Sequence, residues 1–312
     1  MEKGEGENQT AITEFILLGF GDLPELPTLL ILVFLVTYIV TMAGNLLLIA
    51  VVVTDQHLHT AMYFFLGNLS FLETCYTSTI LLRMLDNFIS FTGCMMQFYV
   101  FGALAVAECL LLTVMSYDRY LAICKPLHYM TLMDGKVCTQ LSAGSWASGF
   151  VGTSITICLL SNLNFSGPNE IDHFFCDITS LIKLSCSDTY LVEIMVFSFS
   201  SAVSLIPFLL ILTSYICILK AILRIPSDTG RQKAFSTCSS HLIIVSTFYG
   251  TLIAMYVVPS SDHTLVLNKV ISLLYTVVTP MLNPIVYSLK NKEFHEALKK
   301  LLSAVLAATR KL

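Results

Sequence analysis

The sequence predicts an all-α membrane protein: a seven-transmembrane helix bundle with its N-terminus outside and its C-terminus in the cytoplasm. The first observation behind this prediction is composition. The chain has 312 residues, of which 55% are hydrophobic and 12% are charged, and its mean hydropathy is +0.78. Charged residues are too few to cover the surface of a soluble protein of this length. The other two observations are the spacing of charges along the chain and the distribution of lysine and arginine.

Long stretches of the chain contain no Asp, Glu, Lys or Arg, and one more is interrupted only by Glu73. Each exceeds the roughly 18 residues that indicate a membrane-spanning helix. The uncharged stretches are 26–54, 87–107, 137–169, 194–219, 234–261 and 270–289, and the interrupted one is 56–82. We therefore predict a single domain, 1–312, with an extracellular tail (1–25), spans at about 26–54, 57–82, 91–124, 137–160, 191–223, 231–258 and 266–289, and a cytoplasmic tail (290–312).

An odd number of spans puts the termini on opposite sides of the membrane, and lysine and arginine indicate which side is cytoplasmic. With the N-terminus outside, the outer side holds four of these residues: Lys3, Arg83, Lys183 and Lys269. The cytoplasmic side holds thirteen: Arg119, Lys125, Lys136, Lys220, Arg224, Arg231, Lys233, Lys290, Lys292, Lys299, Lys300, Arg310 and Lys311. Residues 1–25 lack the apolar core of a signal peptide, so we expect the first helix to act as an uncleaved signal anchor.

The segment after the last span predicts a short amphipathic helix. Phe294, Leu298 and Leu301 recur at helical spacing beside several lysines, which favours a helix lying on the inner leaflet. A basic tail without this order is the alternative. In either case we expect a multi-pass protein of the plasma membrane.

Four polar residues lie deep within the predicted spans, where they are costly in lipid and are therefore candidates for function. Glu73 and Glu108 carry carboxylates, and Asn45 and Asn283 carry amides. Two carboxylates in a low dielectric cannot both stay ionised without a cation or a shared proton. A bound sodium ion is one interpretation, and a hydrogen-bonded network with one protonated glutamic acid is the other. No other cofactor or metal is expected.

The run MSYDRYLAIC, residues 115–124, ends the third span with an Asp-Arg pair and continues as KPLHY. From Cys94 to Arg119 the chain covers about 25 residues, or about 37 Å of helix, enough to cross a hydrocarbon core of about 30 Å. LGNLSF (66–71) lies before this run, and KAFSTCSSHL (233–242) and PMLNPIVYSLKNKEF (280–294) lie after it. With these motifs the chain resembles the olfactory (odorant) receptors, a branch of the rhodopsin-like (class A) G-protein-coupled receptors, from about Phe15 to Leu301.

The resemblance implies a mechanism of signalling. An ion pair between Asp118 and Arg119 would hold the inactive state, and movement of the sixth helix would free Arg119 for a heterotrimeric G protein. It further implies that the four buried polar residues converge at mid-bundle, where related receptors hold water or sodium. The residues expected in activation and coupling are Asp118, Arg119, Tyr120, Tyr215, Lys233, Asn283, Pro284 and Tyr287.

The resemblance also implies a ligand pocket between the third, fifth, sixth and seventh helices. Its expected lining is Phe101, Gly102, Ala105, Val106, Phe199, Ser200, Val203, Tyr249, Leu252, Ile253, Tyr256, Ser272 and Thr276. The third helix offers no carboxylate for an amine there, and no lysine lies deep in the seventh helix for a retinal Schiff base. Apolar walls with a few hydroxyls favour a small, neutral, lipophilic ligand. We expect Tyr249 to couple ligand contact to movement of the sixth helix.

Covalent features are expected on the outer face. Cys94 and Cys176 face an oxidising compartment, and the resemblance implies a disulfide between them that pins the long outer loop over the bundle. Ser166 replaces a loop cysteine of the family, which leaves Cys186 without its usual partner. Two sequons predict N-glycosylation, at Asn8 and at Asn164.

The second helix departs from the family pattern at two positions. Ala61 and Leu82 stand where odorant receptors usually have proline. Loss of proline removes kinks, so we expect a straighter helix, with consequences for folding and surface delivery.

Other classes of protein fit the sequence less well. A transporter would require broken helices and repeat symmetry, and a membrane enzyme would require a clustered catalytic set; neither is evident. We predict a receptor, not an enzyme, that binds a small neutral lipophilic odorant and activates a stimulatory, olfactory-type G protein to raise cyclic AMP. The alternative is an odorant-type receptor that acts outside the nose on a non-volatile small metabolite. No nucleic-acid partner is indicated.

Overall fold

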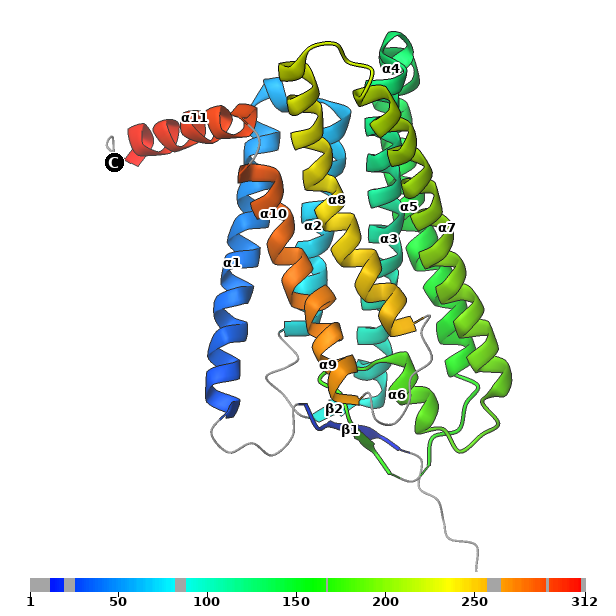
Figure 1. Cartoon of the computed structure of the whole chain (residues 1–312). Helices are drawn as coiled ribbons and strands as arrows, with labels where there is room; N and C mark the ends of the chain where they lie inside the picture. The colour runs from blue at the N-terminus through cyan, green and yellow to red at the C-terminus, as the bar shows by residue number, and fades with distance from the viewer. Residues whose placement is uncertain are drawn as a thin grey trace, which may run out of the picture.

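The computed structural model is a bundle of long helices standing side by side, with a small sheet at one end (Figure 1). The structure describes residues 12–19, 26–81, 88–166, 168–256, 265–289 and 292–309. Within these ranges seven helical stretches form the bundle: α1 (Leu26–Thr54), α2 (Ala61–Leu81), α3 (Phe91–Cys124), α5 (Gly135–Leu160), α7 (Tyr190–Ile222), α8 (Asp228–Tyr256), and α9 (Leu265–Leu273) continued by η3 (Leu274–Val278) and α10 (Thr279–Leu289). We call the end that carries Cys94 the disulfide end, and the opposite end, which carries Arg119, the Arg119 end.

The small sheet at the disulfide end means that the chain is not purely helical. Its strand order is β2 (Phe88–Ser90), β1 (Glu14–Leu17), β3 (Glu170–Ile171). β1 pairs antiparallel with β2, with Phe15 opposite Ile89, and parallel with β3, with Ile16 opposite Glu170. Phe15 is fully buried beneath the sheet. The sheet therefore ties the N-terminal segment to the start of α3 and to the loop between α5 and α7.

Side-chain caps mark where several helices begin. At the start of α3 the Ser90 hydroxyl accepts a hydrogen bond from the Gly93 amide (3.1 Å), and at the start of α5 the Asp134 carboxylate accepts one from the Val137 amide (2.7 Å). Each cap satisfies an amide that has no partner within the helix. Pro126 is the first residue of α4 (Pro126–Leu132), where its missing N–H costs no hydrogen bond.

Among the described residues, six helices are long and apolar enough to cross a membrane: the segments Leu32–Thr54, Phe91–Cys124, Gly135–Leu160, Tyr190–Ile222, Asp228–Met255 and Lys269–Val286. In the described chain α2 is not among them, because Asn68, Glu73 and several hydroxyl side chains lower its hydropathy. It packs within the bundle against both α1 and α3. Polar residues of membrane helices generally face the interior of a bundle. The six candidate spans are consistent with the predicted bundle, and α2 occupies the position of the predicted second span.

α3 runs through the middle of the bundle, whereas α1 lies on its outside. In the apolar window of α3 56% of the residues are buried, against 17% in that of α1. α3 contacts α2, α4, α5, α7 and α8. Outward side chains of the peripheral helices, such as Val36 on α1 and Leu209 on α7, are more than half exposed at 53% and 59%. This apolar belt suits a lipid environment.

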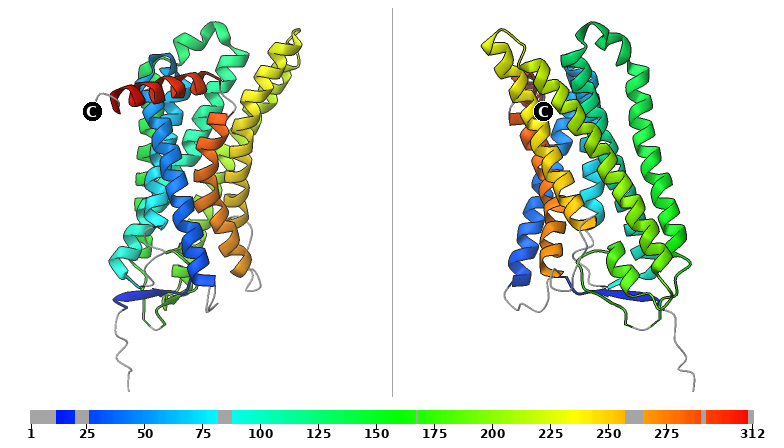
Figure 2. Two further views of the ribbon diagram at one scale, coloured as in Figure 1. Left: turned by 90° about the vertical axis from the view of Figure 1, so that its left-hand side faces the viewer. Right: turned by 45° about the vertical axis from the view of Figure 1, so that its right-hand side comes forward.

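The two ends of the described chain lie at opposite ends of the bundle. β1 lies at the disulfide end, and α11 (Lys292–Thr309) leaves the bundle sideways at the Arg119 end (Figure 2). The start of α11 is anchored, since Phe294 is 3% exposed and Lys300 Nζ lies 3.2 Å from the Asp55 carboxylate. Asp55 caps the short helix η1 (Gln56–Leu58), which follows α1.

Candidate ligand pocket and coupling site

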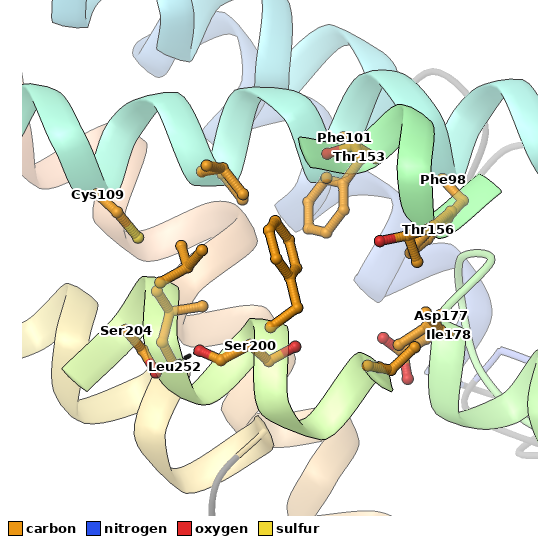
Figure 3. A pocket seen from close by; sticks show the side chains of 16 residues that line it. Phe98, Phe101, Cys109, Thr153, Thr156, Asp177, Ile178, Ser200, Ser204 and Leu252 are labelled. Atoms are coloured by element: carbon orange, nitrogen blue, oxygen red, sulfur yellow. Dashed lines mark hydrogen bonds between the residues drawn. The ribbon is translucent and has the colours of Figure 1, made fainter. Parts of the chain in front are cut away.

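An apolar cavity of about 100 Å³ lies among α3, α5, α7 and α8, toward the disulfide end (Figure 3). One water molecule needs roughly 10–15 Å³ on the same measure, so the cavity has room for a small organic molecule. Its walls are mainly aliphatic and aromatic, and the polar groups among them are hydroxyls, the Cys109 thiol and the carboxylate of Asp177.

Eight of the residues predicted to line a ligand pocket lie on this cavity: Phe101, Gly102, Ala105, Val106, Phe199, Ser200, Val203 and Leu252. Four whose side chains are described do not: Tyr249, Ile253, Ser272 and Thr276. The side chain of Tyr256 lies outside the described residues. Ile253 follows Leu252 by one residue and therefore points about 100° away from it around α8.

The cavity is lined by residues of α5 and not by the residues that were predicted from the seventh helix. Thr276 Oγ1 donates to the backbone oxygen of Ser272 (2.7 Å), and the Ser272 hydroxyl faces His173 in the loop. Thr153 and Thr156 of α5 line the cavity instead. The pocket therefore lies between the third, fourth, fifth and sixth bundle helices.

Eight lining residues were not predicted: Phe98, Cys109, Thr153, Thr156, Asp177, Ile178, Val196 and Ser204. Phe98 and Cys109 lie one helical turn beyond the predicted residues of α3, so extending the helical period would have found them. Asp177 and Ile178 directly follow Cys176. The predicted disulfide from Cys176 to α3 could therefore have indicated that these two residues lie near the pocket. The α5 residues carried no such signal.

Tyr249 lies on the Arg119 side of the cavity. Its ring is fully buried, and its hydroxyl donates to the backbone oxygen of Cys109 (2.7 Å) and lies 3.5 Å from Thr113 Oγ1. Cys109 itself lines the cavity. The hydroxyl therefore joins α8 to α3 directly beneath the pocket.

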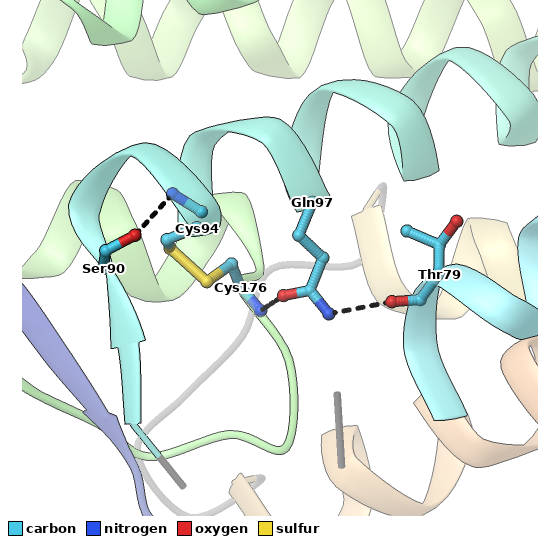
Figure 4. The surroundings of a disulfide bond; sticks show 6 residues. Thr79, Ser90, Cys94, Gln97 and Cys176 are labelled. Atoms are coloured by element: carbon cyan, nitrogen blue, oxygen red, sulfur yellow. Dashed lines mark hydrogen bonds between the residues drawn. A yellow bond between two sulfur atoms is a disulfide. The ribbon is translucent and has the colours of Figure 1, made fainter. Parts of the chain in front are cut away.

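The loop between α5 and α7 is pinned to the bundle at Cys176. The predicted Cys94–Cys176 disulfide is present, with the Cα atoms 5.6 Å apart. The Cys176 amide also donates to Gln97 Oε1 (3.2 Å), and Gln97 Nε2 donates to the Thr79 backbone oxygen (3.3 Å; Figure 4). The loop is thereby linked to α3 covalently and to α2 through the Gln97 side chain.

An aromatic side chain of the loop packs inside the bundle. Phe175 is fully buried, and its ring centroid lies 5.1 Å from that of Phe101. The Phe101 ring lies in turn 4.8 Å from Tyr76 of α2 and 6.0 Å from Tyr275 of η3. Phe101 lines the cavity, so the loop and three helices meet at one pocket residue.

His173 anchors the loop to the seventh bundle helix. It is 5% exposed, and its Nε2 lies 3.3 Å from the Ser272 hydroxyl. Beside it Lys269 Nζ pairs with Asp172 (2.5 Å). Burial lowers the pKa of His173, and Lys269 acts in the same direction, whereas Asp177 and Asp172 oppose it. The imidazole is therefore neutral at neutral pH.

Acidification is expected to destabilise this loop. Because the pKa of His173 is lower in the folded protein than in the unfolded chain, stability decreases as the pH falls below about 6.5. We expect the melting temperature of the purified receptor to drop between neutral pH and about pH 5.5, and to drop less in His173→Gln, which cannot become charged. Asp172, Asp177 and Lys269 are common to both proteins. An equal drop in both would contradict this assignment.

Asp118 and Arg119 form an ion pair at the opposite end of α3. Arg119 Nε donates to Asp118 Oδ2 (3.0 Å), and the Tyr129 hydroxyl of α4 donates to Oδ1 (2.7 Å). The Asp118 side chain is 1% exposed and that of Arg119 is 17%. Burial and the bond to Asp118 raise the pKa of Tyr129, so its hydroxyl stays protonated. Both oxygens of a buried carboxylate are thus satisfied, as stability requires.

The other residues predicted to act in signalling are spread over three helices. Tyr215 of α7 lies 2.6 Å from Nδ1 of His241 on α8, and Tyr120 of α3 is half-buried. Asn283 and Pro284 are buried in α10. The side chains of Lys233 and Tyr287 lie outside the described residues.

The predicted polar cluster is present in part. Glu108 and Asn45 both lie beside Glu73, and Asn45 Nδ2 donates to the backbone oxygen of Pro280 (3.2 Å). Both carboxyl oxygens of Glu73, Oε1 of Glu108, Oδ1 of Asn45 and the amide of Asn283 have no hydrogen-bond partner in the described chain. Those ranges hold no group of three or more His, Cys, Asp or Glu suited to a metal. The unpartnered oxygens fit a hard cation or water.

The outer covalent features have mixed outcomes. Cys186 is a free, exposed thiol close to the Ser166 backbone oxygen, and hydrogen bonding to Ser166, chiefly to its side chain, lowers the pKa of the thiol. Asn164 is exposed and therefore accessible to a glycosylating enzyme. Its glycosylation stays a prediction. Asn8 and Leu82 lie outside the described residues.

The candidate site thus consists of a loop disulfide-bonded to the central helix, an apolar cavity beneath that loop and a buried Asp-Arg pair at the far end of the same helix. A family model described as olfactory receptor matches residues 34–305. The chain is 52% identical to "Olfactory receptor 11A1" of Homo sapiens over 95% of each chain. It is 49% identical to human "Olfactory receptor 6B1" over 95% of this chain and 97% of the relative, and 47% identical to "Olfactory receptor 5AP2" of Mus musculus over 96% of each.

The chain belongs to the olfactory receptor family. It is a multi-pass protein of the plasma membrane, and its family consists of receptors rather than enzymes. Odorants and G proteins are the general partner classes of that family. These comparisons name no ligand for this chain.

Proposed function

We propose that this receptor binds a small, neutral, lipophilic odorant in the cavity and activates a stimulatory, olfactory-type G protein, which raises cyclic AMP. The observation that carries the proposal is the arrangement along α3. The cavity, the Tyr249 contact at Cys109 and the Asp118–Arg119 pair follow one another from the disulfide end to the Arg119 end. Ligand contact can therefore act on the ion pair through helices that share α3.

The chemistry of the cavity supports the ligand class. Burial of about ten carbon atoms at roughly 0.8 kcal/mol each supplies about 8 kcal/mol of gross affinity, and ordering costs leave modest binding. Hydroxyls of Ser200 and Thr156 line the cavity and offer hydrogen bonds to a carbonyl or hydroxyl. Asp177 Oδ2 accepts the Thr179 amide (3.1 Å) as the cap of α6 (Ile178–Lys183), so this lining residue also has a structural role at the start of that helix.

The orientation proposed is disulfide end outside and Arg119 end in the cytoplasm. The Cys94–Cys176 bridge requires an oxidising compartment, and lysine and arginine concentrate toward the Arg119 end. In this orientation α11 lies against the inner leaflet, where the exposed Lys299 can meet lipid headgroups.

The Arg119 end also offers a surface for a G protein. Leu127 and Met130 of α4 are 92% and 80% exposed and offer an apolar surface that a G protein could cover. α4 also supplies Tyr129, whose hydroxyl holds Asp118. A partner that binds α4 can therefore influence the ion pair.

The decisive experiment is a cyclic-AMP assay in cells that express this chain with the olfactory stimulatory G protein, against a panel of neutral volatiles. Arg119→Ala is expected to abolish the response while reaching the surface normally, because the guanidinium is the group released toward the G protein. Surface labelling of both proteins is the control. Silence of the intact chain at good surface expression would contradict the proposal, and a response only to non-volatile metabolites would favour the alternative ligand class.

Removal of the Tyr129 hydroxyl is expected to raise basal activity. Tyr129→Phe leaves Asp118 Oδ1 without its donor, which weakens the inactive arrangement by about 1–2 kcal/mol and should raise basal cyclic AMP several-fold. Tyr117→Phe is the matched control, since Tyr117 is 43% exposed on α3. Unchanged basal activity in Tyr129→Phe would show that the hydroxyl does not hold the inactive state.

We propose in addition that a sodium ion binds at Glu73 and Glu108. The ion would supply the positive charge that lets both carboxylates stay ionised. Replacing choline by sodium should raise the melting temperature of the purified receptor, and Glu73→Gln should remove that increase. Sodium without effect on the intact receptor would favour the network with one protonated glutamic acid.

A further inference from the structure

We propose that Gly152 of α5 sets the upper size of the ligand, because it provides the space in which the Phe199 ring of α7 rests. This inference depends on the proposed function, since it concerns the ligand that the cavity accepts. Gly152 does not line the cavity itself, so it acts by positioning a residue that does.

The contact between the two residues leaves no room for a side chain. A Cβ atom at position 152 would lie 2.6 Å from Cζ of Phe199 and 3.1 Å from its Cε2, whereas ordinary contact begins at 3.4 Å. The tip of the ring therefore occupies the place of the missing methyl group. Phe199 is also a lining residue of the cavity, together with Thr153 and Thr156 of the same α5 face.

Space, rather than backbone conformation, accounts for glycine at this position. Gly152 lies within a regular helix, and the one described glycine with a positive φ is Gly19. Glycine in the interior of a helix is destabilising relative to alanine. Gly152 destabilises its helix and is not required by the backbone conformation, so the contact with the Phe199 ring is the reason for glycine at this position.

The neighbouring glycines are constrained differently. A Cβ atom at Gly149 would collide with the backbone oxygen of Ala103, so α3 and α5 could not approach each other with any larger residue there. At Gly152 the obstacle is the tip of a side chain with two rotatable bonds, which can turn aside. Substitution at 152 is therefore expected to move a ring rather than separate two helices.

The displaced ring has the cavity beside it. When alanine replaces Gly152, its methyl group takes the place of the Phe199 ring tip. The ring then moves into the cavity among α3, α5 and α7, and the cavity becomes shorter. A ligand that fills the cavity then loses contact for its last carbons, whereas a shorter ligand is unaffected. Each excluded methylene should lower potency about fourfold, which corresponds to about 0.8 kcal/mol.

The experiment measures potency along a homologous series of straight-chain aldehydes, from butanal to decanal, by the cyclic-AMP response per receptor at the cell surface. In Gly152→Ala the longest effective aldehydes should lose potency about fourfold or more per methylene, with the shorter ones unchanged. Gly144→Ala is the matched control on α5, because a Cβ atom there meets nothing within 4 Å. Adding Phe199→Leu to Gly152→Ala should restore the response to long aldehydes.

Three results would overturn the inference. One is an unshifted chain-length profile in Gly152→Ala, and another is an equal loss for all aldehydes at normal surface expression. If Gly152→Ala does not reach the surface, Phe199→Leu alone decides, since it should extend the response to longer aldehydes and the absence of any extension overturns the inference. Where the intact receptor responds to another volatile of the panel and not to aldehydes, the homologous series of that volatile replaces them; silence to the whole panel at good surface expression contradicts the proposed function itself.

Discussion

The close packing of α3 in the middle of the bundle is the constraint on which the rest of the structure depends. α3 carries a cavity wall, Glu108 of the polar cluster and the buried Asp118. Its contact with α5 is close enough that only glycine fits at position 149. Because interiors are packed without spare space, a displacement on one side of α3 must be accommodated by the helices that touch it. This physical link joins a pocket at one end to a charged pair at the other.

The polar groups of the bundle are either tied to fixed partners or left with free hydrogen-bonding capacity. Gln97 and Asp118 have their polar atoms paired with backbone or side-chain groups, which fixes the loop at one end and the ion pair at the other. Glu73 has carboxyl oxygens with no partner in the described residues. An unpaired polar group in a low dielectric is costly. Binding of an ion or water, or a change in helix packing that supplies a partner, would therefore stabilise the protein most in the middle of the bundle.

Much of this architecture could be predicted from the sequence, because lipid imposes long uncharged stretches and an asymmetric distribution of lysine. The Cys94–Cys176 disulfide and half of the cavity wall followed from motif resemblance. The remaining wall depends on contacts between distant segments. Thr153 reaches the cavity because Gly149 lets α5 approach α3, and Asp177 reaches it because Cys176 is anchored at Cys94. Tyr249 was expected in the wall but lies beneath it, since its hydroxyl is bonded to the backbone of Cys109.

The central claim is that ligand contact in the cavity separates α8 from the rest of the bundle at the Arg119 end. The most direct measurement is the distance between fluorophores attached through unnatural amino acids at Gln232 of α8 and Thr139 of α5, both of which are exposed. The distance should increase when the most potent odorant is added to the purified receptor with its G protein, and it should return when the odorant is removed. A G protein activated by that odorant with no change in this distance would contradict the account.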